Sequence, residues 1–264
     1  MIVDYHMHLR DDGQRVSHRV ETIERWVDTA TSRGVDEIGF TEHFYYFLET
    51  RALLTVPYQI DHCHIPIEPY VEAVLEAKQR GLPVKLGAEV DYIPGREDEI
   101  RELLAPYPWD FILGSVHYLD GLGMDQEPSL VGAVGPEEAY RRYFNGLGQA
   151  ARTGLFDSLA HPDLVKFFGD VIAWNQEAFV AELDGVCLEV STAGLRKPHG
   201  RIYPEPELLA AARRAGVAVT LASDAHEPDD VGRDLARGAE HARAVGYETV
   251  TVFDRRRARQ VPLG

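Results

Sequence analysis

Two histidines near the amino terminus are spaced so that both could bind one metal ion. His6 and His8 follow the apolar run of residues 2–5, and side chains at positions i and i+2 of an extended strand point to the same face. Comparable polar endings recur along the chain, where strand-like runs close on histidine, glutamate or aspartate at 38–43, 86–89, 112–117, 158–161 and 221–226. Such a series predicts one polar site built from the ends of many strands.

The residues at these endings are typical ligands of transition-metal ions. They are His6, His8, His43, Glu89, His117, His161, Asp224 and His226. Imidazole and carboxylate groups suit zinc, manganese or iron. Any one of these histidines alone would be read as a hydrogen-bonded core residue, but the clustering of ligand types favours a metal site. The set is too large for one tetrahedral ion, so we expect two or three divalent ions, which could hold the oxygens of a phosphate ester and activate water.

The elements that position these residues alternate between strand and helix along the whole chain. Strand-like runs lie near 2–6, 37–42, 84–92, 111–118, 157–161, 186–192, 218–224 and 249–253. Helix-like runs lie near 18–33, 69–80, 96–105, 136–153, 175–183, 205–215 and 231–245. This alternation predicts an α/β fold with a parallel sheet. A closed TIM-like barrel is favoured over an open sheet, because only a barrel brings the carboxyl ends of all strands to one mouth.

Composition places the chain among globular proteins with one large core. The 264 residues carry a formal net charge of −16, which argues against nucleic acid or an anionic membrane as a partner. A phosphate-bearing substrate would need local positive charge, and bound divalent cations could supply it. The start of the chain has no signal-peptide core, and Cys63 and Cys187 form no CxxC spacing, so we expect a cytoplasmic protein of one domain, residues 1–264.

Two loops are candidates for contacts with a substrate. Residues 44–68 are rich in aromatic side chains and follow His43, so they are expected to line or cover the barrel mouth. Residues 191–198 follow another strand and end in Arg196 and Lys197. The planar donors of Arg196 suit a phosphate group. Lys197 and His199 are further candidates for substrate binding.

Taken together, these motifs resemble those of the PHP (polymerase and histidinol phosphatase) superfamily, and more narrowly its histidinol-phosphate phosphatases. The matching segments are DYHMH at 4–8, TEH at 41–43, GAEVDY at 87–92, GSVHYL at 114–119, AHPDLVKFFG at 160–169, STAGLRKP at 191–198 and SDAH at 223–226. Their order and spacing cover nearly the whole chain. The resemblance implies a distorted (β/α)7 barrel with a trinuclear metal site.

The resemblance also implies how the ligands divide among the ions. One ion would take His6, His8, Glu89 and Asp224; a second would take Glu89, His117 and His161; a third would take His43, His226 and one ligand from the loop after His8. Many relatives have a histidine in that loop where this chain has Gln14. Asp12, next to Gly13, is our candidate for the missing ligand, and Asp11 and His18 stay open.

The function implied is hydrolysis of a phosphomonoester, with L-histidinol phosphate as the substrate, in histidine biosynthesis. Glu89, Asp224 and Arg196 are the expected catalytic residues. The alternative is a phosphatase of the same superfamily that acts on another small phosphate ester or on phosphotyrosine. An amidohydrolase barrel also opens with HxH but needs a lysine at a strand end, and Lys85 lies at the start of its strand. The oligomeric state stays open.

Overall fold

A ring of parallel strands forms the centre of the molecule, which is a computed structural model describing residues 1–11, 15–169 and 172–264. The strands follow one another in the order β1-β2-β3-β4-β7-β8-β9. Their bounds are β1 Val3–Asp4, β2 Glu37–Phe40, β3 Val84–Asp91, β4 Phe111–Ser115, β7 Ser158–Leu159, β8 Cys187–Ser191 and β9 Val219–Ala222. The main helices are α1 Val20–Ser32, α3 Glu68–Gln79, α4 Glu97–Leu104, α6 Pro136–Arg152, α7 Gln176–Val180, α8 Pro206–Ala215 and α9 Leu235–Ala244.

The first and last strands of this series meet and nearly close the barrel. The Tyr5 N–H donates to the Leu221 carbonyl at 3.0 Å, and the His8 N–H donates to the Ala225 carbonyl at 2.8 Å. The buried carboxylate of Asp4 also links these two strands, because it accepts hydrogen bonds from the Ser223 N–H at 2.7 Å and the Ser223 hydroxyl at 2.6 Å. The barrel confirms the predicted fold class, a distorted TIM-like α/β barrel.

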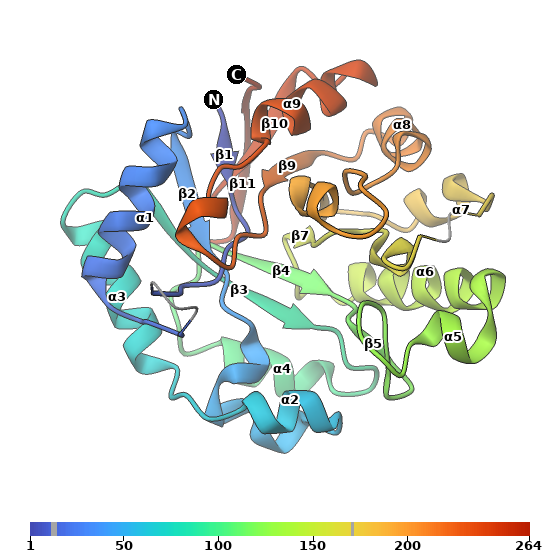
Figure 1. Ribbon diagram of the computed structural model, residues 1–264, viewed down its shortest axis with the longest axis horizontal. Helices are drawn as coiled ribbons and strands as arrows, with labels where there is room; N and C mark the ends of the chain where they lie inside the picture. Colours follow the sequence, from blue (N-terminus) through green and yellow to red (C-terminus); the bar gives the residue numbers. More distant parts are fainter. Residues whose placement is uncertain (12–14, 170–171) are drawn as a thin grey trace.

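Helices surround the strands, as Figure 1 shows. Apolar residues of α1 recur at helical spacing, and its buried face includes Ile23, Trp26 and Val27. The Trp26 ring lies 6.0 Å from the ring of Phe40 in β2, which fixes the helix against the sheet. Strands covered in this way are apolar on both faces, so a buried charged residue within one of them requires a specific explanation.

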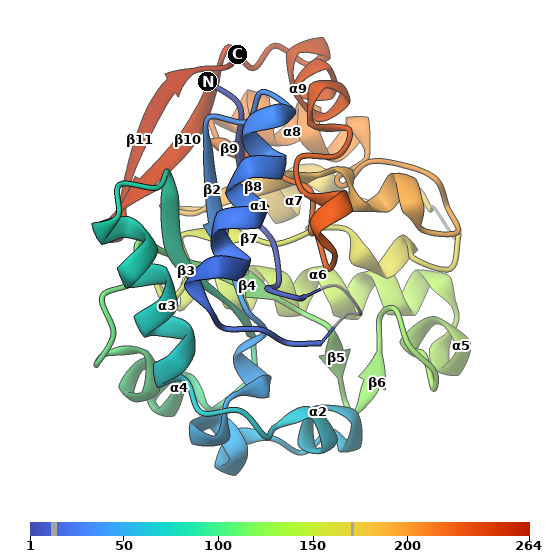
Figure 2. The ribbon, with the colours of Figure 1, turned by 60° about the vertical axis from the view of Figure 1, so that its left-hand side comes forward.

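A carboxyl-terminal hairpin covers the floor of the barrel. Its strands β10 Thr249–Asp254 and β11 Arg257–Pro262 pair antiparallel with each other, and Figure 2 shows them at the end of the barrel opposite β5 Tyr118–Leu119 and β6 Leu122–Gly123. Phe253 stacks on Phe111 at 5.3 Å and lies 5.6 Å from Tyr5. The run 249–253 is therefore a strand, as predicted, but it lies outside the parallel barrel, and β11 was not predicted.

The loops at the opposite end form the barrel mouth. Residues 44–68 contain two 3₁₀ turns, Phe44–Tyr46 and Leu48–Leu53, and the short helix α2 Pro57–His62. The β5–β6 hairpin leads to a second short helix, α5 Leu130–Val134. In the described parts of the chain, none of the helices has the length and apolar character needed to cross a membrane.

Candidate metal centre

A single buried carboxylate lies at the centre of the barrel mouth. Glu89 belongs to β3, and the pairing of β2 with β3 continues past the end of β2 as a bridge between His43 and Glu89. Glu89 Oε1 lies 3.0 Å from His161 Nε2 and 3.5 Å from His117 Nε2. Glu89 Oε2 lies 2.7 Å from His43 Nδ1, 3.4 Å from His6 Nε2 and 3.7 Å from His8 Nε2. Each carboxylate oxygen thus faces its own group of imidazole nitrogens.

Asp224 approaches the same centre from the end of β9. Its Oδ1 lies 3.7 Å from His6 Nε2, 3.6 Å from His8 Nε2 and 3.5 Å from His226 Nδ1. The backbone of Asp224 has a φ of 52°, a conformation that costs free energy for residues other than glycine and persists where the surroundings impose it. The Arg196 guanidinium donates from Nη2 to the carbonyl of Ser223, the preceding residue, at 2.6 Å.

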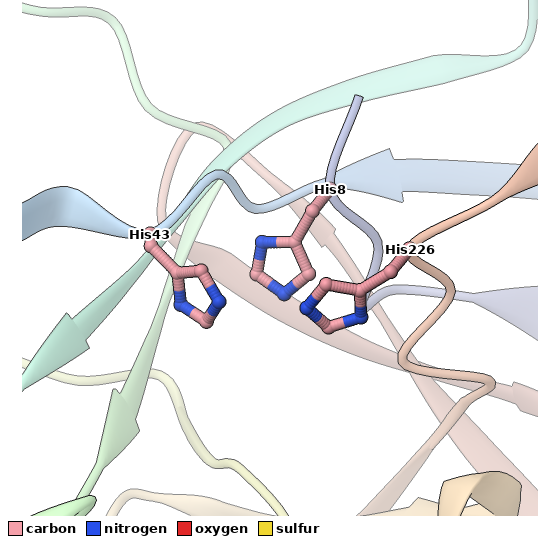
Figure 3. A group of neighbouring side chains, drawn as sticks. All are labelled: His8, His43 and His226. Carbon is pink, nitrogen blue, oxygen red and sulfur yellow. The ribbon is translucent and has the colours of Figure 1, made fainter. Parts of the chain in front are cut away.

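The donor atoms fall into three overlapping groups that could each hold an ion. The groups are His6, His8 and Asp224; His6, Glu89 and His161; and His8, His43 and His226. Within each group the ligand atoms all lie within 4.8 Å of one another. Figure 3 shows the third group, whose three imidazoles converge from separate chain segments. His6 and His8 each belong to two of these groups, and the group of His6, His8 and Asp224 forms part of the first ligand set implied by the resemblance.

Several buried nitrogen and oxygen atoms at this centre have no hydrogen-bond partner among the described residues. They include His6 Nε2, His8 Nε2, His43 Nδ1 and Glu89 Oε2. Buried polar atoms are almost always satisfied, and leaving them unpaired costs free energy. Even the 2.7 Å approach of His43 Nδ1 to Glu89 Oε2 lacks hydrogen-bond geometry. Atoms that bind the same cation must lie close together without hydrogen-bonding to each other. The arrangement of these residues therefore fits divalent metal ions.

A second layer of carboxylates orients the histidines from behind. Glu189 Oε2 lies 2.9 Å from His6 Nδ1, and Asp91 Oδ1 lies 2.8 Å from His117 Nδ1. Glu42 Oε1 lies near His8 Nδ1 as well, at 3.5 Å, but without a hydrogen bond. A carboxylate on the far nitrogen fixes the tautomer and the ring plane of a metal-binding histidine. These three acids were not proposed as site residues from the sequence.

The ionisable groups of this site shift one another's pKa values strongly. Burial alone would raise the pKa of Glu89, but the imidazoles of His6, His117 and His43 hold that pKa well below its usual value. Burial would lower the pKa of His117, yet Asp91 and Glu89 raise it to about 10. Burial, reinforced by the neighbouring His8, lowers the pKa of His226 to about 3. In the metal-free site some imidazoles therefore carry protons that a bound ion must displace.

The remaining candidates from the sequence lie at different distances from this centre. The Lys197 side chain lines the mouth cavity of about 220 Å³. Arg196 is not among the residues that line it; Arg196 Nε lies 3.6 Å from Asp230 Oδ2, and Nη1 is buried without a partner in the described structure. His199 does not line the cavity either; its Nε2 lies 2.8 Å from the hydroxyl of Tyr203, which does line it.

Two candidates for the last ligand in the loop after His8, His18 and Asp11, make contacts outside the three ligand groups. His18 Nε2 lies 3.0 Å from Glu42 Oε2, and Asp11 Oδ1 accepts from the Arg15 N–H at 3.3 Å. Neither belongs to the three ligand groups. Asp12, Gly13 and Gln14 lie outside the described residues.

Removing the carboxylate behind His6 should weaken metal binding without removing any ligand. Glu189 also accepts the His161 N–H at 3.1 Å, so it supports two ligands at once. We expect Glu189→Ala to lower metal affinity about 10- to 100-fold, measured by competition with a fluorescent chelator. Glu189→Gln, which keeps the shape and one acceptor, is the matched variant and should lose less. Equal metal affinity in all three proteins would contradict this role.

A parallel barrel whose strand ends gather histidines around one bridging carboxylate defines a class of metal-dependent hydrolases. The PHP domain family model matches residues 4–193. A protein of Deinococcus radiodurans named "Probable histidinol-phosphatase" is 33% identical over 97% of this chain and 98% of its own length. The histidinol-phosphatase of Bacillus subtilis is 29% identical over 80% of this chain and 90% of its own length.

Solved structures give the same picture of the fold. A histidinol phosphate phosphatase from Lactococcus lactis, solved with zinc, L-histidinol and phosphate, superposes with a TM-score of 0.76 at 22% identity, covering 98% of each chain. The chain belongs to the histidinol-phosphatase family of the PHP superfamily.

Proposed function

We propose that this protein is a metal-dependent histidinol-phosphatase that hydrolyses L-histidinol phosphate to L-histidinol and phosphate in histidine biosynthesis. The observation that carries the proposal is the carboxylate of Glu89, buried among imidazoles at the mouth of the barrel. The full-length similarity to curated histidinol-phosphatases supports the choice of substrate. The likeness to the enzyme solved with zinc, L-histidinol and phosphate supports it further.

The residues that would hold the ions are those around Glu89 and Asp224. His6, His8, His43, His117, His161 and His226 supply the imidazole donors. Divalent ions held by these residues would polarise the phosphoryl oxygens, lower the pKa of a coordinated water and supply the local positive charge that a protein of formal charge −16 needs in order to bind a phosphate ester.

Lys197 lines the cavity and would act on the phosphate group. Arg196 does not line the cavity; it would act indirectly, by holding the loop of Asp224 through its hydrogen bond to the Ser223 carbonyl. Tyr45, Tyr46 and Tyr58 form an aromatic side of the same cavity, which suits an imidazole ring and limits access of bulk water.

A panel of phosphate esters tests the proposal. Phosphate release would be measured with L-histidinol phosphate, phosphotyrosine and a generic aryl phosphate, with elemental analysis of the same protein sample. We expect kcat/KM to be highest for L-histidinol phosphate and the protein to contain zinc, iron or manganese. Turnover of L-histidinol phosphate no faster than that of the aryl phosphate would favour the alternative of another small ester or phosphotyrosine.

Replacing Lys197 should affect the phosphate group and spare the metal. We expect Lys197→Met to raise KM for the ester about 10-fold or more, because a charge-assisted bond is lost, with unchanged metal content. Lys85→Met is the matched control, since Lys85 pairs with Glu37 and Asp254 away from the cavity. A Lys197→Met protein that has lost its metal would show that Lys197 acts on the metal site instead.

A further inference from the structure

One acidic side chain of the mouth cavity takes no part in the metal centre. Asp125 follows β6 and lines the cavity together with Tyr58, Tyr118 and Lys197. Its Oδ1 is buried and has no hydrogen-bond partner among the described residues. A buried carboxylate oxygen without a partner costs free energy. Its presence at a binding cavity therefore indicates a partner that arrives with the ligand.

The backbone around Asp125 is held firmly at the cavity wall. The Met124 N–H donates to the His117 carbonyl at 2.8 Å, and the Gly123 N–H donates to the Pro128 carbonyl at 3.0 Å. Met124 itself is buried. These hydrogen bonds attach the loop to His117, which faces Glu89. The Asp125 carboxylate is therefore held close to the metal centre.

In the described structure none of the neighbouring cationic side chains forms a hydrogen bond with Asp125 Oδ1. His117 has Asp91 at 2.8 Å on Nδ1 and Glu89 at 3.5 Å on Nε2. The Lys197 ammonium lies 5.7 Å from the centre of the Phe167 ring. Asp125 also belongs to none of the three ligand groups. The partner that remains for the Asp125 carboxylate is therefore a cationic group of the ligand, rather than a metal ion or a side chain.

The other walls of the cavity restrict the kind of ligand that could bring this cation. Tyr45 stacks against His43 at 4.9 Å, and Tyr45 and Tyr46 meet edge to face at 5.0 Å. The Tyr118 hydroxyl donates to the Gln126 amide oxygen at 3.0 Å, which fixes the residue next to Asp125. The ligand must therefore combine a phosphate at the ions, a cation beside it and a flat ring against the tyrosines.

We propose that Asp125 binds the primary ammonium group of the substrate and selects phosphate esters that carry an amine next to the ester carbon. The proposal rests on the proposed function and deepens it. In L-histidinol phosphate the amine sits on the carbon adjacent to the CH₂–O–P group, which places it near the metal centre where Asp125 lies. The phosphate of phosphotyrosine is separated from its amine by the aromatic ring, so that substrate would leave Asp125 unpaired.

The test compares two substrates that differ only in the amine. L-Histidinol phosphate and the phosphate ester of 3-(imidazol-4-yl)propan-1-ol would be assayed with the wild-type enzyme and Asp125→Asn. We expect the wild-type enzyme to prefer the amine-bearing ester about 10- to 100-fold in kcat/KM, and Asp125→Asn to lose most of that preference. Asp120→Asn is the matched control, because Asp120 lies on the same hairpin and pairs with Arg142.

Binding of the alcohol product gives a readout that does not depend on turnover. Calorimetry with L-histidinol should show weaker binding to Asp125→Asn by a similar factor, and binding of 3-(imidazol-4-yl)propan-1-ol should be the same in both proteins. Asp125→Glu keeps the charge and should retain more affinity for L-histidinol than the asparagine variant. If neither variant folds, the wild-type protein still decides the matter, since equal affinity for the two alcohols would overturn the proposal.

The outcomes separate this proposal from the proposed function. Failure of the wild-type enzyme to prefer L-histidinol phosphate over an aryl phosphate would contradict the proposed function. An unchanged preference for the amine in Asp125→Asn would contradict only the assignment of Asp125. Loss of metal from Asp125→Asn would also overturn the assignment, by showing that the carboxylate serves the metal centre.

Discussion

Replacing Glu89 by glutamine should abolish phosphatase activity and remove much of the bound metal. The carboxylate has both oxygens facing imidazole groups, and an amide cannot bridge two cations in the same way. Metal ions contribute several kcal/mol to stabilisation of charge in the transition state, so we expect kcat/KM to fall by about 10³-fold or more. Phosphate release and elemental analysis of the same preparation measure both effects.

A control near the same strand end separates this effect from general damage. Asp91 lies two residues further along, faces the same side, and contacts His117 without belonging to a ligand group. Asp91→Asn should lose far less activity and recover part of it in excess metal. Full metal content and normal turnover in Glu89→Gln would show that Glu89 is not the shared ligand.

Removal of metal by a strong chelator should inactivate the enzyme, and restoration by divalent metal should depend on pH. The ions displace protons from the histidines that bind them. Carboxylates raise the pKa of His117 to about 10 and that of His6 well above its usual value, against the effect of burial. The neighbouring carboxylates therefore favour the protonated imidazoles in the absence of metal, and rising pH should strengthen metal binding.

Calorimetry in buffers of different ionisation enthalpy would count the protons released as metal binds. We expect release at neutral pH and progressive loss of metal on acidification. His62, which lies outside the cluster with Nδ1 2.7 Å from the Tyr58 carbonyl, provides the control through His62→Gln, which should leave the pH dependence unchanged. Metal affinity that is independent of pH between neutral and mildly acidic conditions would contradict the proton linkage.

The barrel and the meeting of the inner candidate ligands could be predicted because each strand and the polar residue at its end lie in one short segment of sequence. Apolar runs covered on both faces define parallel strands, and a histidine or carboxylate at the end of such a run must lie at the barrel mouth. His6, Glu89 and Asp224 meet for that reason. The hairpin strand β11 escaped prediction because most of its residues are exposed, so no apolar alternation marks it.

The second layer of the site could not be predicted because it depends on contacts between strands. Glu189 interrupts an apolar run in β8, and a buried charge there was the available signal. Its partner, His6, lies far away in sequence. Arg196 shows the converse case: its loop reaches the mouth as predicted, but the direction of its side chain is set by Ser223 and Asp230.

The aromatic cluster of Tyr5, Phe111 and Phe253 has a consequence for the order of events during turnover. It fills the axis of the barrel below the metal centre, so reactants and products share the passage at the mouth. On the proposed function, we expect an ester to enter with its phosphate end leading, so that after cleavage the alcohol would lie nearer the exit than the inorganic phosphate. The alcohol would then depart first, and we expect free phosphate to compete with the next ester for the enzyme.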